Sequence, residues 1–152
     1  MRRAVWLVLL VAGLEPAPFP YEYRGWFHVK SMVLEEGHPL FEAFGGIHHV
    51  YANAEAYRAL RDPKMTRFPV GSVLVFDLLE ARREKGALVE GKRKVLAIMR
   101  KVRGAEETGG WIFQAFAGGD PGKPIVKDPV KECFQCHTGA GTRDFVFSAW
   151  RP

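Results

Sequence analysis

The residues best suited to chemistry form the run Cys133-Phe134-Gln135-Cys136-His137 near the end of this 152-residue chain. Cys-x-x-Cys-His is the attachment motif of a c-type haem. Its two thiols, one helical turn apart, can form thioether bonds with the two haem vinyl groups. The adjacent His137 can then offer a neutral imidazole nitrogen to the iron as the proximal ligand. The motif therefore predicts one covalent haem c per chain, held by Cys133, Cys136 and His137.

Two other interpretations of the motif are a thiol redox pair and half of a zinc site. Cys133 and Cys136 are the only cysteines, so a four-ligand zinc site would need two distant histidines without a second paired motif. A thioredoxin-like pair follows a first strand, whereas this pair lies close to the C-terminus. A disulfide across two residues would restrict the denatured chain little. Haem attachment is the better interpretation.

The N-terminus has the pattern of a secretory signal peptide. Arg2 and Arg3 precede the apolar run 4–14, and three prolines follow between residues 16 and 20. We predict that residues 1–17 are removed, with Ala17 the last of them, and that 18–152 form a single domain. The apolar run is short for a membrane span, and a retained N-terminal anchor is the alternative. Export predicts a periplasmic location, which suits haem attachment to reduced thiols outside the cytoplasmic membrane.

Composition is that of an ordinary globular protein, with 47% hydrophobic and 26% charged residues. A chain of 152 residues can bury a core around a cofactor. The formal net charge is +5, but basic residues alternate with acidic ones, as in 80–84 and 90–94. The absence of a long basic tract argues against nucleic-acid binding.

The apolar pattern predicts an α+β fold, mainly an antiparallel β-sheet of about five strands with a few helices. The expected strands are 26–33, 47–53, 72–79, 94–102 and 111–116, with 72–79 central because both of its faces are apolar. Asn53 is placed to cap a helix over 54–61. A C-terminal helix, begun by Asp128 and Pro129, is expected to carry the haem motif. We expect 81–91 to be an exposed connection with a helical turn, and the apolar tail 144–150 to fold back over the haem.

The order of these segments resembles the cytochrome P-460 and cytochrome c′-beta family. The resemblance rests on the following pieces: Trp26…Ser31-Met32, Val50-Tyr51-x-Asn53, Phe68-Pro69-x-Gly71-Ser72-Val73, Gly109-Gly110-Trp111, Cys133-x-x-Cys136-His137 and Asp144-x-Val146-Phe147. The family implies a periplasmic homodimer with a β-sheet core and a haem at its edge. The motif histidine would be the proximal ligand, and the distal position would be open to a small molecule.

Members of this family differ in the residues on the distal side of the haem, and these residues distinguish their activities. Those that oxidise hydroxylamine carry a lysine cross-linked to the haem and a nearby carboxylate. The lysine position falls on Phe76 and the carboxylate position near Leu96, while Lys92 and Lys94 lie outside the matched positions. Phe76 has no amine and Leu96 no base, so the resemblance disfavours hydroxylamine oxidation. It implies an apolar distal pocket, lined by Phe76 and Leu96, for uncharged ligands such as NO or CO.

His48 falls where the hydroxylamine-oxidising members carry a distal arginine. Strand alternation puts His48, Val50 and Ala52 on one face, and the resemblance turns this face towards the haem. His48 is therefore the candidate distal or catalytic residue, able to hydrogen-bond a ligand, donate a proton or coordinate iron. Hydrogen bonding within the sheet is the structural alternative, and weaker claims belong to His28, His38 and His49.

Three functions follow from these alternatives. The first is a cytochrome that binds NO or CO at an open haem position. The second is an electron-transfer cytochrome with a six-coordinate haem, whose sixth ligand is His48 or one of Met32, Met65 and Met99. The third is a haem enzyme that acts on a small nitrogen species or peroxide with His48 as its acid–base group. The redox partner is not indicated by the sequence.

Overall fold

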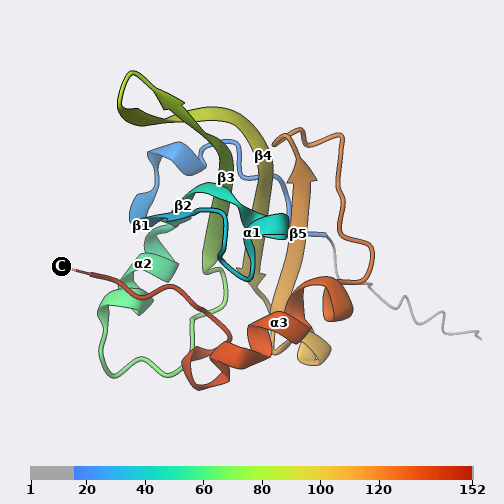
Figure 1. Ribbon diagram of the computed structural model, residues 1–152. Coiled ribbons are helices and arrows are strands. Elements are labelled where there is room, and N and C mark those ends of the chain that lie inside the picture. Colours follow the sequence, from blue (N-terminus) through green and yellow to red (C-terminus); the bar gives the residue numbers. More distant parts are fainter. Residues whose placement is uncertain (1–15, 152) are drawn as a thin grey trace, which may run out of the picture.

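Five antiparallel strands lie side by side in the order in which they occur in the chain (Figure 1). The computed structural model describes residues 16–151. The strands are β1 (Phe27–Leu34), β2 (Gly46–Ala52), β3 (Val73–Glu84), β4 (Ala87–Lys101) and β5 (Trp111–Ala117). The strand β3 is central, as its apolar faces predict. The predicted α+β class with a mainly antiparallel sheet is confirmed.

Short helices connect and cover the strands. They are η1 (Tyr23–Gly25), α1 (Phe41–Phe44), α2 (Ala54–Arg61), η2 (Glu106–Thr108), η3 (Val130–Phe134), α3 (Gln135–His137) and η4 (Thr138–Arg143). Asn53 caps α2 as predicted, because its side-chain oxygen accepts from the Ala56 amide at 3.1 Å. Within residues 16–151, no helix is long and apolar enough to cross a membrane.

The two faces of the sheet carry separate apolar clusters. The first cluster joins the sheet to α2 and to the chain around the Cys-x-x-Cys-His motif; its members include Val50, Leu74, Met99, Trp111, Phe113 and Val146. The second cluster holds the N-terminal segment, coloured blue in Figure 1, against the other face; it contains Ala17, Tyr23, Val75, Leu96, Ile98 and Phe116. The sheet is therefore a two-sided scaffold with the motif on the first face.

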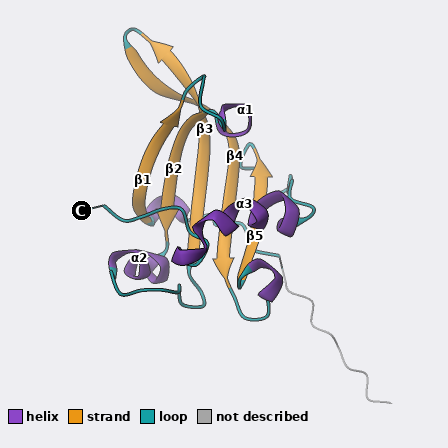
Figure 2. Ribbon diagram, turned by 60° about the horizontal axis from the view of Figure 1, so that its bottom comes forward, coloured by secondary structure: helices purple, strands orange, loops and turns teal. Residues whose placement is uncertain are grey.

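The prediction of a connection with a helical turn at 81–91 is wrong. Strands β3 and β4 continue as a two-stranded arm, which projects beyond the sheet (Figures 1 and 2) and pairs down to Glu84 and Ala87. Lys85 (φ 49°) and Gly86 (φ 83°) form its tip, and two successive positive φ angles give the twist that suits a tight hairpin. The side chains of the arm are mostly exposed, so the sequence here lacks the alternation of apolar and polar residues that would predict strands.

The predicted signal sequence lies almost wholly outside the described residues. Ala17, expected to be the last residue removed, is 4% exposed and packs in the second cluster beside Phe19 and Tyr23. The boundary between signal and domain stays a prediction.

Candidate haem site

The motif lies on a helical segment that crosses the first face of the sheet near β4 and β5 (Figure 2). Asp128 begins this segment, since its carboxylate accepts from the Lys131 amide at 3.1 Å. The side chain of Glu132 accepts from the Asp128 amide at 3.0 Å, which completes a reciprocal cap. Pro129 follows the cap, as predicted, so local sequence chemistry fixes where the motif helix starts.

His137 is oriented by a single backbone contact. Its Nδ1 atom lies 2.7 Å from the carbonyl oxygen of Phe145 and donates to it, so Nε2 carries the lone pair. Burial lowers the pKa of His137, and the hydrogen bond with Phe145 partly opposes that shift. The rings of Phe113 and Phe147 flank the imidazole at 5.0 and 5.2 Å. A neutral imidazole with Nε2 available is the form that an iron ligand requires.

Cys133 and Cys136 are unpaired thiols in different surroundings. Cys133 is partly buried against the first cluster, whereas Cys136 is exposed. Burial raises the pKa of the Cys133 thiol to about 11, and the negative charge of Glu132 adds to the rise. Cys133 is therefore a protonated thiol at neutral pH, a weak nucleophile without external activation.

A second aromatic group lies on the same face, around Phe76. The ring of His48 meets the ring of Phe76 edge to face at 4.8 Å, and Phe44 of α1 meets Phe76 at 6.1 Å. Phe76 and Cys133 both pack against the first cluster. Figures 1 and 2 show α1 and α3 on this one side of the sheet, towards its opposite ends. The structure thus brings His48 and Phe76 together on the motif face.

His48 is 2% exposed, and its Nε2 atom is hydrogen-bonded to the carbonyl oxygen of Phe44. Its Nδ1 atom is buried and has no hydrogen-bond partner among the described residues. Burial lowers the pKa of His48, with smaller contributions from the positive charges of Lys30 and Lys94, while the bond to Phe44 opposes the shift. The ring is neutral and is held by the backbone of α1.

The expectation that Leu96 lines the pocket with Phe76 is wrong. Leu96 pairs with Asp77 and lies fully buried in the second cluster, on the opposite face of the sheet. The residue of β4 directly across from Phe76 is Ala97. A register difference of one residue moves a side chain to the other face. The small Ala97 therefore takes the place that the sequence assigned to Leu96.

The remaining histidines lie away from Phe76. His49 faces the other side of the sheet, where its Nδ1 atom lies 2.6 Å from the Ser31 hydroxyl and its Nε2 atom lies 2.6 Å from the Glu90 carboxylate. His28 contacts the same hydroxyl at 2.9 Å. His38 accepts from the Leu40 amide in an exposed loop. These contacts account for all three side chains without a role at the haem.

The candidate methionine ligands are dispersed. Met99 is buried in the first cluster, and Met65 is exposed in the loop after α2. Met32 pairs with His48 across β1 and β2 and is 39% exposed, so it shares the face of His48. Met32 is thus the methionine that the fold brings to the distal group.

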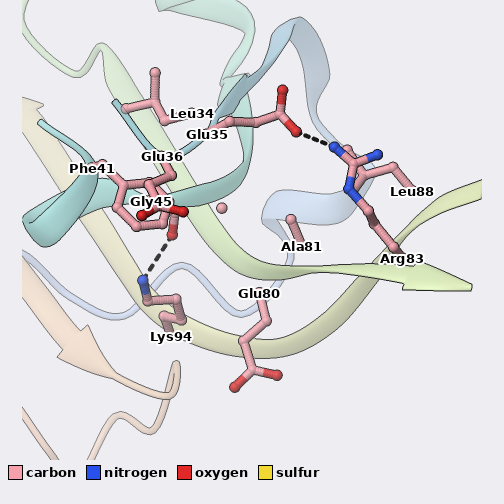
Figure 3. A pocket seen from close by; sticks show the side chains of 11 residues that line it. Leu34, Glu35, Glu36, Phe41, Gly45, Glu80, Ala81, Arg83, Leu88 and Lys94 are labelled. Carbon is pink, nitrogen blue, oxygen red and sulfur yellow. Dashed lines mark hydrogen bonds and ion pairs between the residues drawn. The ribbon is translucent and has the colours of Figure 1, made fainter. Parts of the chain in front are cut away.

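A hollow of about 440 Å³ lies beside α1 at the base of the arm (Figure 3). Lys94 reaches across it and donates to the Gly45 carbonyl at 2.7 Å, and Arg83 pairs with Glu35 at 2.5 Å. A second hollow of about 460 Å³ lies between η2 and the start of the motif helix. Neither is lined by His137, Cys133 or Phe76. Lys94 thereby fixes Gly45, the residue between α1 and β2, three residues before His48.

The tail after the motif contributes residues that the sequence left without individual roles. Phe145 supplies the carbonyl for His137, and Asp144 forms a buried ion pair with Lys101 at 2.8 Å. The only indication in the sequence that this tail matters was the stretch Asp144-x-Val146-Phe147, on which the family resemblance partly rests. A backbone acceptor has no side-chain signature, so the role of Phe145 could not be assigned from residue types.

One face of the antiparallel sheet carries an imidazole with Nε2 available, two unpaired thiols and several aromatic rings. This set of residues suits a haem-binding cytochrome. The family model for cytochrome P460 matches residues 20–148, and the chain belongs to that family. The resemblance seen in the sequence is confirmed, and with it the protein is a haem-binding cytochrome. No curated protein is significantly similar to the chain.

Proposed function

We propose that this protein is a mono-haem c-type cytochrome that binds small uncharged ligands such as NO or CO at an open distal position. The observation that carries the proposal is the aromatic wall around Phe76 on the motif face, where the hydroxylamine-oxidising members have a lysine. Phe44 and the neutral ring of His48 complete this wall. An aromatic surface of this kind favours a neutral diatomic over a charged substrate.

Within this proposal, the motif residues hold the cofactor. Cys133 and Cys136 would form the two thioether bonds, one haem per chain, and His137 would ligate the iron through Nε2. The haem held there would supply an iron able to bind a diatomic molecule. The protein contributes the orientation of His137 through Phe145, and an apolar surface that limits water around Phe76.

Hydroxylamine oxidation finds little support among the residues present. Phe76 has no amine to cross-link, and Lys94, the nearest alternative considered from the sequence, donates its amine hydrogen to Gly45. The small residue opposite Phe76 is Ala97, which carries no base. His48 is a titratable side chain that meets Phe76 edge to face, and its Nε2 atom is already bonded to the Phe44 carbonyl.

Electron transfer with a six-coordinate haem is the second candidate. Met32 and His48 are directly opposed on β1 and β2, so both side chains belong to the motif face. Met32 is partly exposed and unbranched, which gives it freedom to reach an iron. This arrangement favours Met32 over Met65 and Met99 as the alternative sixth ligand.

An optical titration of the reduced protein with CO separates these functions. We expect wild-type protein and Met32→Leu protein to give the same CO-induced spectral change, because the sixth position is open in both. A spectrum that ignores CO in wild type but responds in Met32→Leu or His48→Leu would instead identify a sixth ligand and refute the open site. An ordinary c-type haemochrome spectrum in alkaline pyridine would exclude a lysine cross-link.

We further propose a periplasmic homodimer, as the family resemblance implies. Strand β1 is an edge of the sheet, and it exposes Phe27, Met32 and Val33. Open edges with exposed apolar side chains are suited to pairing with a second chain. Sedimentation of the haem-loaded protein and of Val33→Lys protein tests this. The proposal requires the wild type to be dimeric and the variant to dissociate more readily.

A further inference from the structure

The carbonyl group that orients His137 belongs to an unusual backbone corner. Asp144 (φ 53°) and Phe145 (φ 67°) are consecutive non-glycine residues with left-handed φ angles. A side chain at Cβ makes this conformation costly, so it persists only where surrounding contacts impose it. The corner follows η4 directly and ends the helical segment that carries the haem motif.

Three hydrogen bonds join Asp144 to the loop before β3, to the end of β4 and to the start of β5. Its carboxylate accepts from the Phe68 amide and from the Lys101 amine, each at 2.8 Å. Its backbone carbonyl accepts from the indole of Trp111 at 2.9 Å. The Lys101 amine also donates to the Gly109 carbonyl at 2.9 Å. Asp144 and Lys101 are 6% and 8% exposed, so their ion pair is shielded from water.

Phe145 transmits this anchoring to the motif helix. Its amide donates to the Ala140 carbonyl at 3.0 Å, and its ring packs against Phe134 at 4.8 Å. The ring also closes over Gly109, where an added Cβ would lie 2.2 Å from a ring carbon. The carbonyl of Phe145 is thus fixed with respect to both the sheet and the helix of His137.

We propose that the buried Lys101–Asp144 ion pair is a positioning device for the proximal ligand, fixing the Phe145 carbonyl against Nδ1 of His137. This inference rests on the haem ligation by His137 in the proposed function. A well-placed acceptor on Nδ1 makes the imidazole a stronger electron donor through Nε2. Stronger donation favours ferric over ferrous iron and so lowers the reduction potential. Lys101 and Asp144 are thus positioning residues that act through Phe145.

The test is the reduction potential of the haem-loaded protein, measured by spectroelectrochemical titration. We expect Asp144→Asn and Lys101→Met each to shift the potential in the positive direction, because each loosens the corner and weakens the bond to His137. The control is Asp77→Asn, which removes a charge from another buried, fully bonded carboxylate on the second face of the sheet. It should lower stability without a comparable shift.

The two single variants also separate positioning from a direct effect of charge. Loss of the negative Asp144 would raise the potential through the electric field, whereas loss of the positive Lys101 would lower it. Shifts of opposite sign would therefore overturn the proposal, as would shifts no larger than that of Asp77→Asn. Positive shifts in both variants would support it.

A combined variant keeps the test decisive if a lone buried charge prevents folding. Lys101→Met with Asp144→Gly removes both charges, and glycine accepts the left-handed conformation without strain. Its net charge equals that of wild type, so a field effect predicts no shift while the positioning role predicts a positive one. The readout does not require an open distal site. Wild-type protein that fails to bind CO would refute the proposed function and leave this measurement valid.

Discussion

The imidazole of His48 and the ring of Phe76 lie edge to face, with centroids 4.8 Å apart, on the face of the sheet that carries the haem motif. His48 is held by the Phe44 carbonyl and Phe76 is flanked by Phe44, so three side chains form one aromatic wall. This wall and His137 on the motif helix, the proposed iron ligand, lie on the same face.

Replacing both motif thiols should abolish covalent haem attachment. Cys133→Ser and Cys136→Ser proteins should each keep one thioether bond, and the double variant should keep none. Haem staining after denaturing electrophoresis measures this directly. Staining of the double variant at wild-type intensity would contradict the assignment of the motif.

Replacing His137 should remove the proximal ligand while the thioether bonds remain. We expect His137→Ala protein to retain covalent haem but to show a changed ferrous spectrum, restored in part by added imidazole. The matched control is His49→Ala, which removes an imidazole bonded to Ser31 and Glu90 on the other face. An unchanged spectrum in His137→Ala protein would show that another residue ligates the iron.

The buried neutral His48 should make the fold sensitive to acid. Burial lowers the pKa of His48 below the unfolded value of about 6.5, so the unfolded chain binds the proton more readily. This contribution to the free energy of unfolding is present above about pH 6.5 and is lost as the pH falls below it. His48→Leu protein should therefore lose less stability than wild type between pH 7 and pH 5.

Denaturant unfolding of the two haem-loaded proteins at both pH values measures this difference. Lys30, Lys94 and His49 also lower the pKa of His48, and all three residues are kept in the variant. Equal losses in the two proteins would show that His48 does not titrate in this range on unfolding.

Removing Asp77 should destabilise the scaffold without altering the haem. Asp77 is fully buried and accepts from Tyr23 and Arg93, each at 2.6 Å, so Asp77→Ala leaves the partly exposed guanidinium of Arg93 without its carboxylate partner. Arg93 keeps some access to water, so the loss of its partner should cost less than the about 3–5 kcal/mol of a fully buried ion pair, but more than the loss of an exposed one. Glu84→Ala, which breaks the exposed pair with Arg82, should cost about 0–1 kcal/mol. Denaturant unfolding measures the stability loss of both variants. A changed haem spectrum in Asp77→Ala protein would contradict the claim that the second face of the sheet does not affect the haem on the first.

Much of the fold could be predicted because local chemistry decides it. Asn53 and Asp128 cap the helices that they were expected to cap, and the doubly apolar run 72–79 occupies the centre of the sheet. The arm at 81–91 could not be predicted, since its strands pack against no core and carry no apolar alternation. Its hydrogen bonds join the two strands to each other rather than to a buried face.

The distal side was predicted in part. Phe76 lies on the motif face as expected, but Leu96 lies on the other. The position near Leu96 came from a match to the family across the variable segment 81–91, and such a match does not fix a position to within one residue. One residue of error places Leu96 where Ala97 lies. The contact between Phe145 and His137 lay beyond prediction for a different reason, because any residue could supply that carbonyl.

The order of the strands has a consequence for biosynthesis. Each strand of the sheet pairs with its neighbour in the chain, and all five precede Cys133. Pairing between neighbours closes short loops, which folds quickly. The five strands can therefore pair before Cys133 and Cys136 are synthesised, so the proposed attachment of haem to these thiols would take place beside a sheet that is already formed.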